Sequence, residues 1–186
     1  MLTKIIYLIF LLIILIIVDN VREKFTNSRI NKLKYKIYWI NMNKSINRRI
    51  WMENQFKKFN VLYNERIKAI DGKKMNYNNL IIEDINKYKN SEIACTLSHL
   101  KAIKKAYDNN DEICYVMEDD ISLDLINNWK ITIDVVLKQI PKDWEIINLS
   151  LSSPNILEDY LKLDESNIFS KWADNHTSTL CYIINR

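Results

Sequence analysis

The segment Ile113–Asp120 constrains the fold of this chain more than any other. It reads Ile-Cys-Tyr-Val-Met-Glu-Asp-Asp, so a short apolar run ends on three consecutive carboxylates. This pattern predicts a buried strand that delivers acidic side chains at its carboxyl end, where open α/β sheets keep their ligands. Adjacent carboxylates repel one another unless water or a hard cation neutralises them. We therefore expect Glu118 and Asp120 to hold a divalent metal; a solvated acidic turn after a core strand is the alternative.

Strand-like and helix-like segments alternate along the chain from Tyr35 onward. Strands are expected at residues 35–41, 61–70, 113–117, 144–149 and 180–184. Helices are expected after Ser45, over 77–89, after Ser91 and over 129–139. Strands that alternate with helices imply an α/β fold, with a mainly parallel sheet and helices on both faces.

Two local patterns predict where side chains point. The helix after Ser91 has apolar residues at helical spacing, which predicts its buried face: Ile93, Leu97, Leu100, Ile103 and Tyr107. Gly72 is the only glycine in the chain and follows an expected strand. We expect it to form a turn with a positive φ angle.

The composition of the chain limits the number of domains and the kinds of partner that we expect. The 186 residues suffice for one domain with a sizeable core. The net charge of +4 is spread along the chain and comes mostly from lysine, so we expect no nucleic-acid partner. The cysteines Cys95, Cys114 and Cys181 lie in apolar segments without metal-ligand spacing, and we expect them to be buried free thiols, with a disulfide as the alternative.

The N-terminus predicts a membrane anchor. Ile5–Val18 is an unbroken apolar run, and the residues after it offer no small-residue cleavage site. As a helix it spans roughly 21 Å, short of the hydrocarbon core unless Met1 and Leu2 extend it. We expect residues 1–18 to be an uncleaved apolar anchor helix, 19–34 a polar basic stem and 35–186 the folded domain. The basic residues after the anchor favour the cytoplasmic side for the domain of this single-pass membrane protein.

Five sequence blocks occur in an order that resembles glycosyltransferase family 25. This family includes bacterial lipooligosaccharide galactosyltransferases and procollagen galactosyltransferases. The blocks at 38–49, 65–73, 91–102 and 116–121 are similar to the family patterns INLDRSPDRR, ERxxAIDGK, GEIGCxLSHLKA and xLEDDV, and 178–185 is a fainter match to GTHAYLIS. The chain departs from these patterns at Ser91, Ala94 and Ser178, where the family has glycine. It also ends at Arg186, soon after the last block, so we expect an incomplete C-terminal part.

The resemblance implies a GT-A-like domain that moves a hexose, with galactose as the first guess, from a UDP-sugar. The acceptor would be a glycan, a lipid-linked sugar or a protein hydroxyl. The resemblance implies Mn²⁺ or Mg²⁺ held by Asp120 and Glu118, with Asp119 orienting the loop or a sugar hydroxyl. An inverting reaction needs a carboxylate base. Glu145 and Asp174 are candidates for that base on chain order, with surface charge as the alternative for both.

The resemblance also implies a set of residues that contact the nucleotide-sugar: Asn41, Arg48, Arg49, Asp71, Gly72, Lys73, Ser98 and His99. Guanidinium groups suit phosphate oxygens, so Arg48 and Arg49 either bind the diphosphate or form a solvated first helical turn. Asp71 either contacts the nucleotide or stabilises the turn at Gly72. His99 either touches phosphate or acceptor, or is a structural histidine. His176 is a further candidate metal ligand.

Two other functions fit parts of the sequence. The lost glycines and the early end favour a catalytically inactive relative that serves as a membrane-tethered binding or scaffold protein. The acidic strand end by itself also suits a metal-dependent phosphohydrolase, which would release phosphate without an acceptor.

Overall fold

The computed structural model describes residues 33–74, 87–150, 158, 161 and 178–186. The expected anchor, most of the stem, and the candidate residues Asp174 and His176 lie outside these ranges. Most of the helix expected over 77–89 lies outside them too. Within the described ranges, none of the helices combines the length and the apolar character needed to cross a membrane.

The described elements follow the predicted order, with ends that differ by a few residues. The strands are β1 (Lys36–Asn41), β2 (Asn64–Lys68), β3 (Ile113–Glu118), β4 (Ile146–Asn148) and β5 (Cys181–Asn185). The helices are α2 (Ile46–Lys58), α3 (Asn90–Asp108) and α4 (Ile133–Gln139), with a 3-10 turn, η3 (Asp124–Asn128), between β3 and α4. The α/β class is confirmed.

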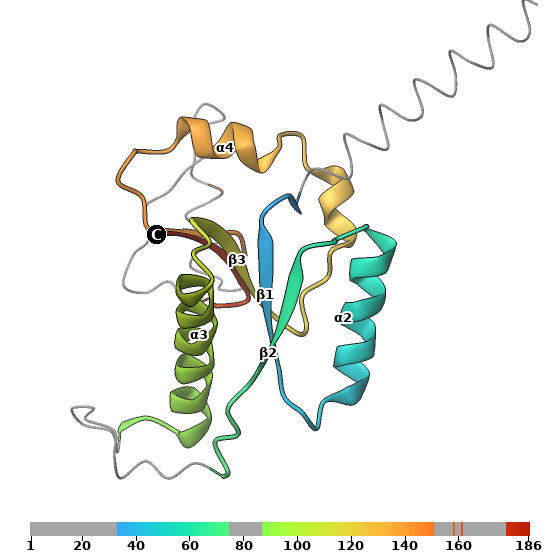
Figure 1. The fold of residues 1–186 in the computed structure, drawn as a ribbon, viewed down its shortest axis with the longest axis vertical. Helices are drawn as coiled ribbons and strands as arrows, with labels where there is room; N and C mark the ends of the chain where they lie inside the picture. The colour runs from blue at the N-terminus through green and yellow to red at the C-terminus, as the bar shows by residue number, and fades with distance from the viewer. Residues whose placement is uncertain (1–32, 75–86, 151–157, 159–160, 162–177) are drawn as a thin grey trace, which may run out of the picture.

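The five strands form one mixed sheet in the order β2-β1-β3-β5-β4 (Figure 1). β1 is parallel to β2 and β3, whereas β5 is antiparallel to both β3 and β4. The prediction of a mainly parallel sheet was therefore wrong. Alternating strands and helices imply parallel neighbours only when each new strand is added by a helical crossover, and β5 instead inserts between β3 and β4.

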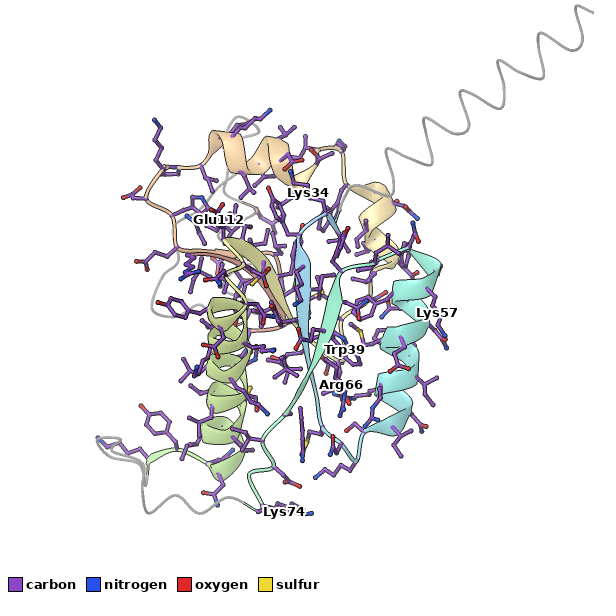
Figure 2. All side chains as sticks on the ribbon, in the orientation of Figure 1. Lys34, Trp39, Lys57, Arg66, Lys74 and Glu112 are labelled. Carbon is purple, nitrogen blue, oxygen red and sulfur yellow. The ribbon has the colours of Figure 1, made fainter. Side chains whose placement is uncertain are left out.

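Helices cover both faces of the sheet, because alternate residues of β1 point to opposite sides. Ile37 and Trp39, the latter labelled in Figure 2, belong to a core that includes residues of α2 and α4. The Trp39 ring meets the Phe56 ring of α2 edge-on, with the ring centroids 5.7 Å apart. Tyr38 and Ile40 face α3 in a second core. The helix positions thus follow from the period-2 pattern of a strand buried on both sides.

The buried face of α3 differs from the predicted one. Leu100 and Tyr107 are 53% and 59% exposed, although Ile93 is buried as expected. The buried residues are mostly small: Ala94, Ser98, His99, Ala102 and Ala106 accompany Ile93. Large side chains of the sheet, such as Tyr38, already fill the layer between sheet and helix, so only small residues of the helix fit against them.

Gly72 is required by packing rather than by its backbone angle. Gly72 does not have a positive φ, so that prediction was wrong; in the described part of the chain the positive angles belong to Asn60 and Asn110. A Cβ atom on Gly72 would lie only 2.6 Å from the carbonyl oxygen of Asn90, at the start of α3. The glycine lets the segment after β2 approach the N-terminus of α3.

Candidate functional site

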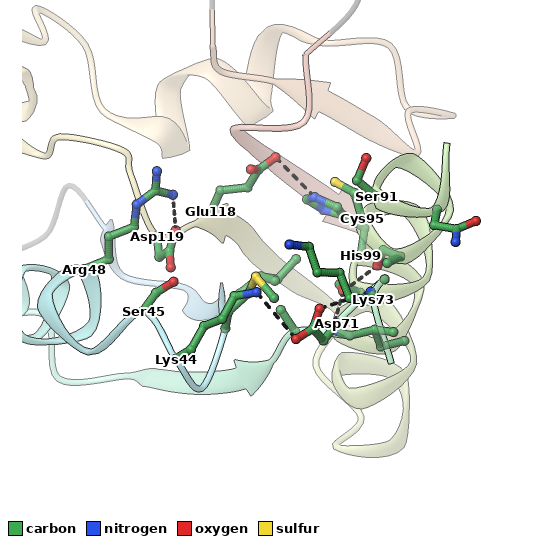
Figure 3. Close-up of a pocket in the computed structure, with 18 of the residues that line it drawn as sticks. Lys44, Ser45, Arg48, Asp71, Lys73, Ser91, Cys95, His99, Glu118 and Asp119 are labelled. Carbon is green, nitrogen blue, oxygen red and sulfur yellow. Dashed lines mark hydrogen bonds and ion pairs between the residues drawn. The ribbon is translucent and has the colours of Figure 1, made fainter. Parts of the chain in front are cut away.

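A cleft lies at the carboxyl edge of the parallel strands. Because β1, β2 and β3 run in the same direction, their carboxyl ends meet at one edge of the sheet. The cleft has a volume of about 690 Å³ and is lined by the loop after β1, residues 69–73, the first half of α3 and the end of β3 (Figure 3). The sequence-based prediction that ligand-facing residues follow β3 agrees with this position.

The three carboxylates after β3 lie in three different environments. Glu118 and Asp119 line the cleft, whereas Asp120 is not among its lining residues. Asp119 is buried and Asp120 is exposed. Glu118 accepts a hydrogen bond from Thr179 at 2.6 Å, and its Oε1 lies 3.4 Å from Nε2 of His99. The contact with His99 holds the pKa of Glu118 below its usual value, although burial opposes this shift.

Asp119 joins the end of β3 to the end of β1 and the first turn of α2. Asn41 Nδ2 donates a hydrogen bond to Asp119 Oδ2 at 2.5 Å. Arg48 Nη1 donates to Asp119 Oδ1 at 2.9 Å and to Asp120 Oδ2 at 3.0 Å. The hydrogen bond to Asp119 raises the pKa of Arg48 above its ordinary value. One guanidinium nitrogen thus contacts two of the three acids.

Asn41 is the centre of this network. Its side chain is buried, and Nδ2 also donates to the carbonyl oxygen of Ser45 at 3.2 Å. Its Oδ1 accepts from Arg66 Nε at 2.9 Å and from Arg49 Nε at 3.4 Å. Sequence reasoning did not single out Arg66, although it lies in the second block that resembles the family. Arg49 supports the loop after β1 through this contact and is not among the cleft residues.

The opposite side of the cleft contains His99, Cys95 and Glu118. His99 comes from α3, and its Nδ1 lies 3.0 Å from the hydroxyl oxygen of Tyr182 in β5. Burial lowers the pKa of His99, but the Cys95 sulfur and the Glu118 carboxylate outweigh it and raise the pKa to about 9. Sequence reasoning treated these residues separately. The spacing Cys95-x-x-x-His99 was the available signal, because it puts both on one helix face.

Ser98 and Asp71 hold the segment after β2 in place. Ser98 Oγ accepts a hydrogen bond from the Ile70 backbone nitrogen at 2.9 Å and donates to the Ala94 carbonyl oxygen at 2.6 Å. Asp71 accepts from the Lys73 backbone nitrogen at 3.2 Å, and this bond lowers its pKa. Lys44 Nζ lies 3.5 Å from Asp71. Asp71, Gly72 and Lys73 all line the cleft.

The cysteines are partly as expected. None of the three forms a disulfide, and Cys114 and Cys181 are buried. Cys95 is exposed and lines the cleft, so the prediction of a buried thiol was wrong there. A helix residue that lines a cleft can have the same apolar neighbours in the sequence as a buried core residue. The sequence alone therefore does not distinguish an exposed Cys95 from a buried one.

A second cleft, of about 650 Å³, adjoins the first. Cys95 and His99 line both clefts, and Glu145 and Thr179 line the second. Glu145, a candidate base on chain order, is therefore near the site, on the side of β4. Thr179 was not predicted, because its role depends on β5 lying next to β3.

The mixed α/β sheet and the acidic strand end at a cleft are consistent with a GT-A-like domain. The sequence profile of glycosyltransferase family 25 (LPS biosynthesis protein) matches residues 34–186. The chain belongs to glycosyltransferase family 25, and the resemblance stated from its sequence blocks is confirmed. The family implies glycosyltransferase activity, with a sugar donor and a glycan acceptor. No curated protein matches the chain.

Proposed function

We propose that the chain transfers a hexose from a UDP-sugar to a hydroxyl of a glycan, a lipid-linked sugar or a protein. Galactose is the first donor to test. The observation that carries the proposal is the acidic end of β3, which opens onto the 690 Å³ cleft in a family 25 chain. A cleft of this size is in the range that holds small ligands.

The charges around the cleft suit the reaction. Transfer breaks the bond between the anomeric carbon and the diphosphate, so negative charge grows on the leaving group. Four cationic side chains line the cleft: Lys44, Arg48, Lys73 and Lys89. Fixed cations at the point where charge develops stabilise the transition state more than the ground state.

The carboxylates also suit Mn²⁺ or Mg²⁺. Oxygens of Asp119 and Asp120 converge on one cationic atom, Arg48 Nη1, and paired carboxylate oxygens are what these ions prefer. The sequence paired Asp120 with Glu118, but the contacts of Glu118 with Thr179 and His99 favour Asp119 as the partner of Asp120. A bound ion would act as a Lewis acid on the diphosphate. Arg48, once released, would be free to donate to phosphate oxygens.

The proposed enzyme also needs a catalytic base and a membrane anchor. We assign the base of an inverting transfer to Glu145, because it lines the cleft next to the proposed donor site. Residues 1–18 would anchor the chain in a membrane, with the domain on the cytoplasmic side, as the flanking charges favour.

Donor binding tests the proposal. The full-length chain in detergent is titrated with UDP-galactose, UDP-glucose and UDP-N-acetylhexosamines, with and without Mn²⁺, and its thermal unfolding is followed. We expect one UDP-sugar to stabilise the protein in the presence of Mn²⁺, and Asp120→Asn to remove that effect. Asp124→Asn is the matched control, because Asp124 is exposed and pairs with Lys58. If no UDP-sugar stabilises the unaltered chain, the proposal fails.

A catalytically inactive family member is the second candidate. It is favoured by Ser91, whose side chain stands at the cleft where the family has glycine. Such a protein would bind the UDP-sugar without releasing UDP in the presence of any acceptor. Measured turnover of UDP-sugar removes this candidate.

A further inference from the structure

Three potential metal ligands converge at one wall of the cleft. Cys95 and His99 are four residues apart on α3, so their side chains lie one above the other. Glu118 reaches the same point from the end of β3. The Cys95 sulfur, a ring nitrogen of His99 and a carboxylate oxygen of Glu118 all lie within 4.8 Å of one another. Figure 3 shows Glu118, His99 and Cys95 together beside the helix.

The buried nitrogen of His99 gives an independent indication of a ligand. The His99 side chain is only 8% exposed, and no group in the described part of the chain hydrogen-bonds its Nε2. Glu118 Oε1 is at 3.4 Å, which is an ion-pair contact and not a well-formed hydrogen bond. A buried ring nitrogen that has this long ion-pair contact but no hydrogen bond is poorly satisfied, and such atoms are costly and rare in native proteins.

The other nitrogen of His99 is held as in known metal sites. Nδ1 lies 3.0 Å from the Tyr182 hydroxyl, which can fix the orientation of the ring. A metal-bound histidine nearly always uses its second nitrogen in such a hydrogen bond. With Nδ1 held by Tyr182, Nε2 is the ring nitrogen that lies toward Glu118.

We propose that Cys95, His99 and Glu118 form a binding site for Zn²⁺. A thiolate, an imidazole and a carboxylate are together the donor set of a borderline-soft ion, whereas Mg²⁺ and Mn²⁺ avoid sulfur. In a tetrahedral zinc site the ligand atoms are roughly 3.4–3.6 Å apart. The pair His99–Glu118 is already at 3.4 Å, and the Cys95 sulfur lies within 4.8 Å of both ligand atoms.

Three protein ligands leave one coordination position open, as in catalytic zinc sites. All three ligands line the cleft, so this position faces the space where a ligand of the cleft binds. An oxygen donor of that ligand, such as a hydroxyl or a phosphate oxygen, can take it. The zinc site is separate from the carboxylates Asp119 and Asp120, and it does not depend on the proposed transfer reaction.

Cobalt binding tests the zinc site without any nucleotide. The full-length chain in detergent is stripped with a chelator, kept in a non-thiol reductant and titrated with Co²⁺. We expect one Co²⁺ per chain, with thiolate-to-cobalt charge-transfer absorption in the near ultraviolet that Zn²⁺ abolishes by displacement. Absence of this absorption in the unaltered chain overturns the proposal, even if UDP-sugars bind.

Variants assign the ligands. Cys95→Ser should abolish the charge-transfer absorption, and His99→Gln and Glu118→Gln should weaken Zn²⁺ binding at least about tenfold. Tyr182→Phe should weaken it by about tenfold, because it removes the bond that orients His99. Matched controls are Thr96→Ala beside Cys95, and His176→Gln, the only other histidine of the chain. If Cys95→Ser retains the absorption, or His176→Gln loses it, the ion is bound elsewhere and the proposal fails.

Discussion

The two walls of the cleft differ in chemistry although one strand end supplies both. We call the hydrogen-bonded network of Asn41, Arg48, Arg66 and Asp119 the guanidinium wall; Arg48 and Asp119 are its members that line the cleft. We call Cys95, His99 and Glu118, which line the cleft, together with Tyr182, which contacts His99, the histidine wall; it brings sulfur, imidazole and carboxylate together. Glu118 and Asp119 are neighbours in sequence, yet each belongs to a different wall.

The difference follows from strand geometry. Successive side chains of an extended segment point to opposite sides, so two adjacent acids can serve two separate sites. Among the described residues, no buried side-chain atom of the guanidinium wall lacks a hydrogen-bond partner, whereas His99 Nε2 on the histidine wall does. A run of acidic residues in the sequence therefore does not show whether its carboxylates belong to one site or to two. The following substitutions test how independent the two walls are.

Asn41→Ala should have the largest effect on stability. The substitution removes the buried amide that donates to Asp119 and accepts from Arg66, so both partners lose a hydrogen bond. We expect the free energy of unfolding to fall by about 3 kcal/mol. Urea denaturation measures this change. If the free energy of unfolding falls by less than about 0.5 kcal/mol, water replaces the amide and the hydrogen bonds of Asn41 do not stabilise the guanidinium wall.

Ala102→Leu tests the packing behind the histidine wall. Ala102 is fully buried between α3 and the sheet, so added volume should push α3 away and cost about 2 kcal/mol. Leu100→Ala, on the exposed face two residues earlier, should change stability by less than about 0.5 kcal/mol. Equal effects in thermal and urea unfolding would contradict the observed orientation of α3.

Gly72→Ala tests the segment that connects the two walls. The new Cβ would meet the carbonyl oxygen of Asn90, so the segment must shift away from α3. We expect a loss of about 1–2 kcal/mol, because the clash is with backbone. Ser98→Ala, which removes the hydroxyl that holds Ile70, should act in the same direction. A neutral Gly72→Ala variant in urea unfolding would show that the contact with α3 is dispensable.

Glu65→Gln serves as a reference outside both walls and should have the smallest effect. Burial would raise the pKa of Glu65, but Lys36, 2.8 Å away, outweighs it and lowers the pKa below 4.5. The pair therefore stabilises the fold above the unfolded-state pKa, and this stabilisation is lost as pH falls through the folded-state pKa. We expect less than about 1 kcal/mol. In urea unfolding from pH 7 down to pH 3, the free energy of unfolding should fall less for Glu65→Gln than for the unaltered chain. An equal fall would contradict a stabilising Glu65–Lys36 pair.

The sequence predicts the local parts of this fold well. β1 and β3 are apolar and β-branched or aromatic on both faces, which only a buried strand explains. The acids at the end of β3 could be placed at the carboxyl edge of the sheet, where the cleft lies, because this position follows from strand direction. The family blocks then identified the chain from the order of these same segments.

The wrong sequence-based predictions concern features that depend on contacts between segments far apart in the sequence. The direction of β5 depends on which strand it pairs with, and its sequence is equally suited to either direction. The face of α3 was mispredicted because small residues, not the leucines, meet the aromatic side chains of the sheet. The convergence of Glu118 with Cys95 and His99 requires β3 and α3 to be adjacent, which no local pattern contains.

The buried amide of Asn41 has a consequence for the chemical ageing of the protein. Hydrolysis of this amide converts Nδ2, a donor 2.5 Å from Asp119, into a carboxylate oxygen at the same place. Two negative groups would then face each other in the core. A single deamidation event at this position would disable one side of the cleft, while the sheet beneath it keeps its hydrophobic contacts.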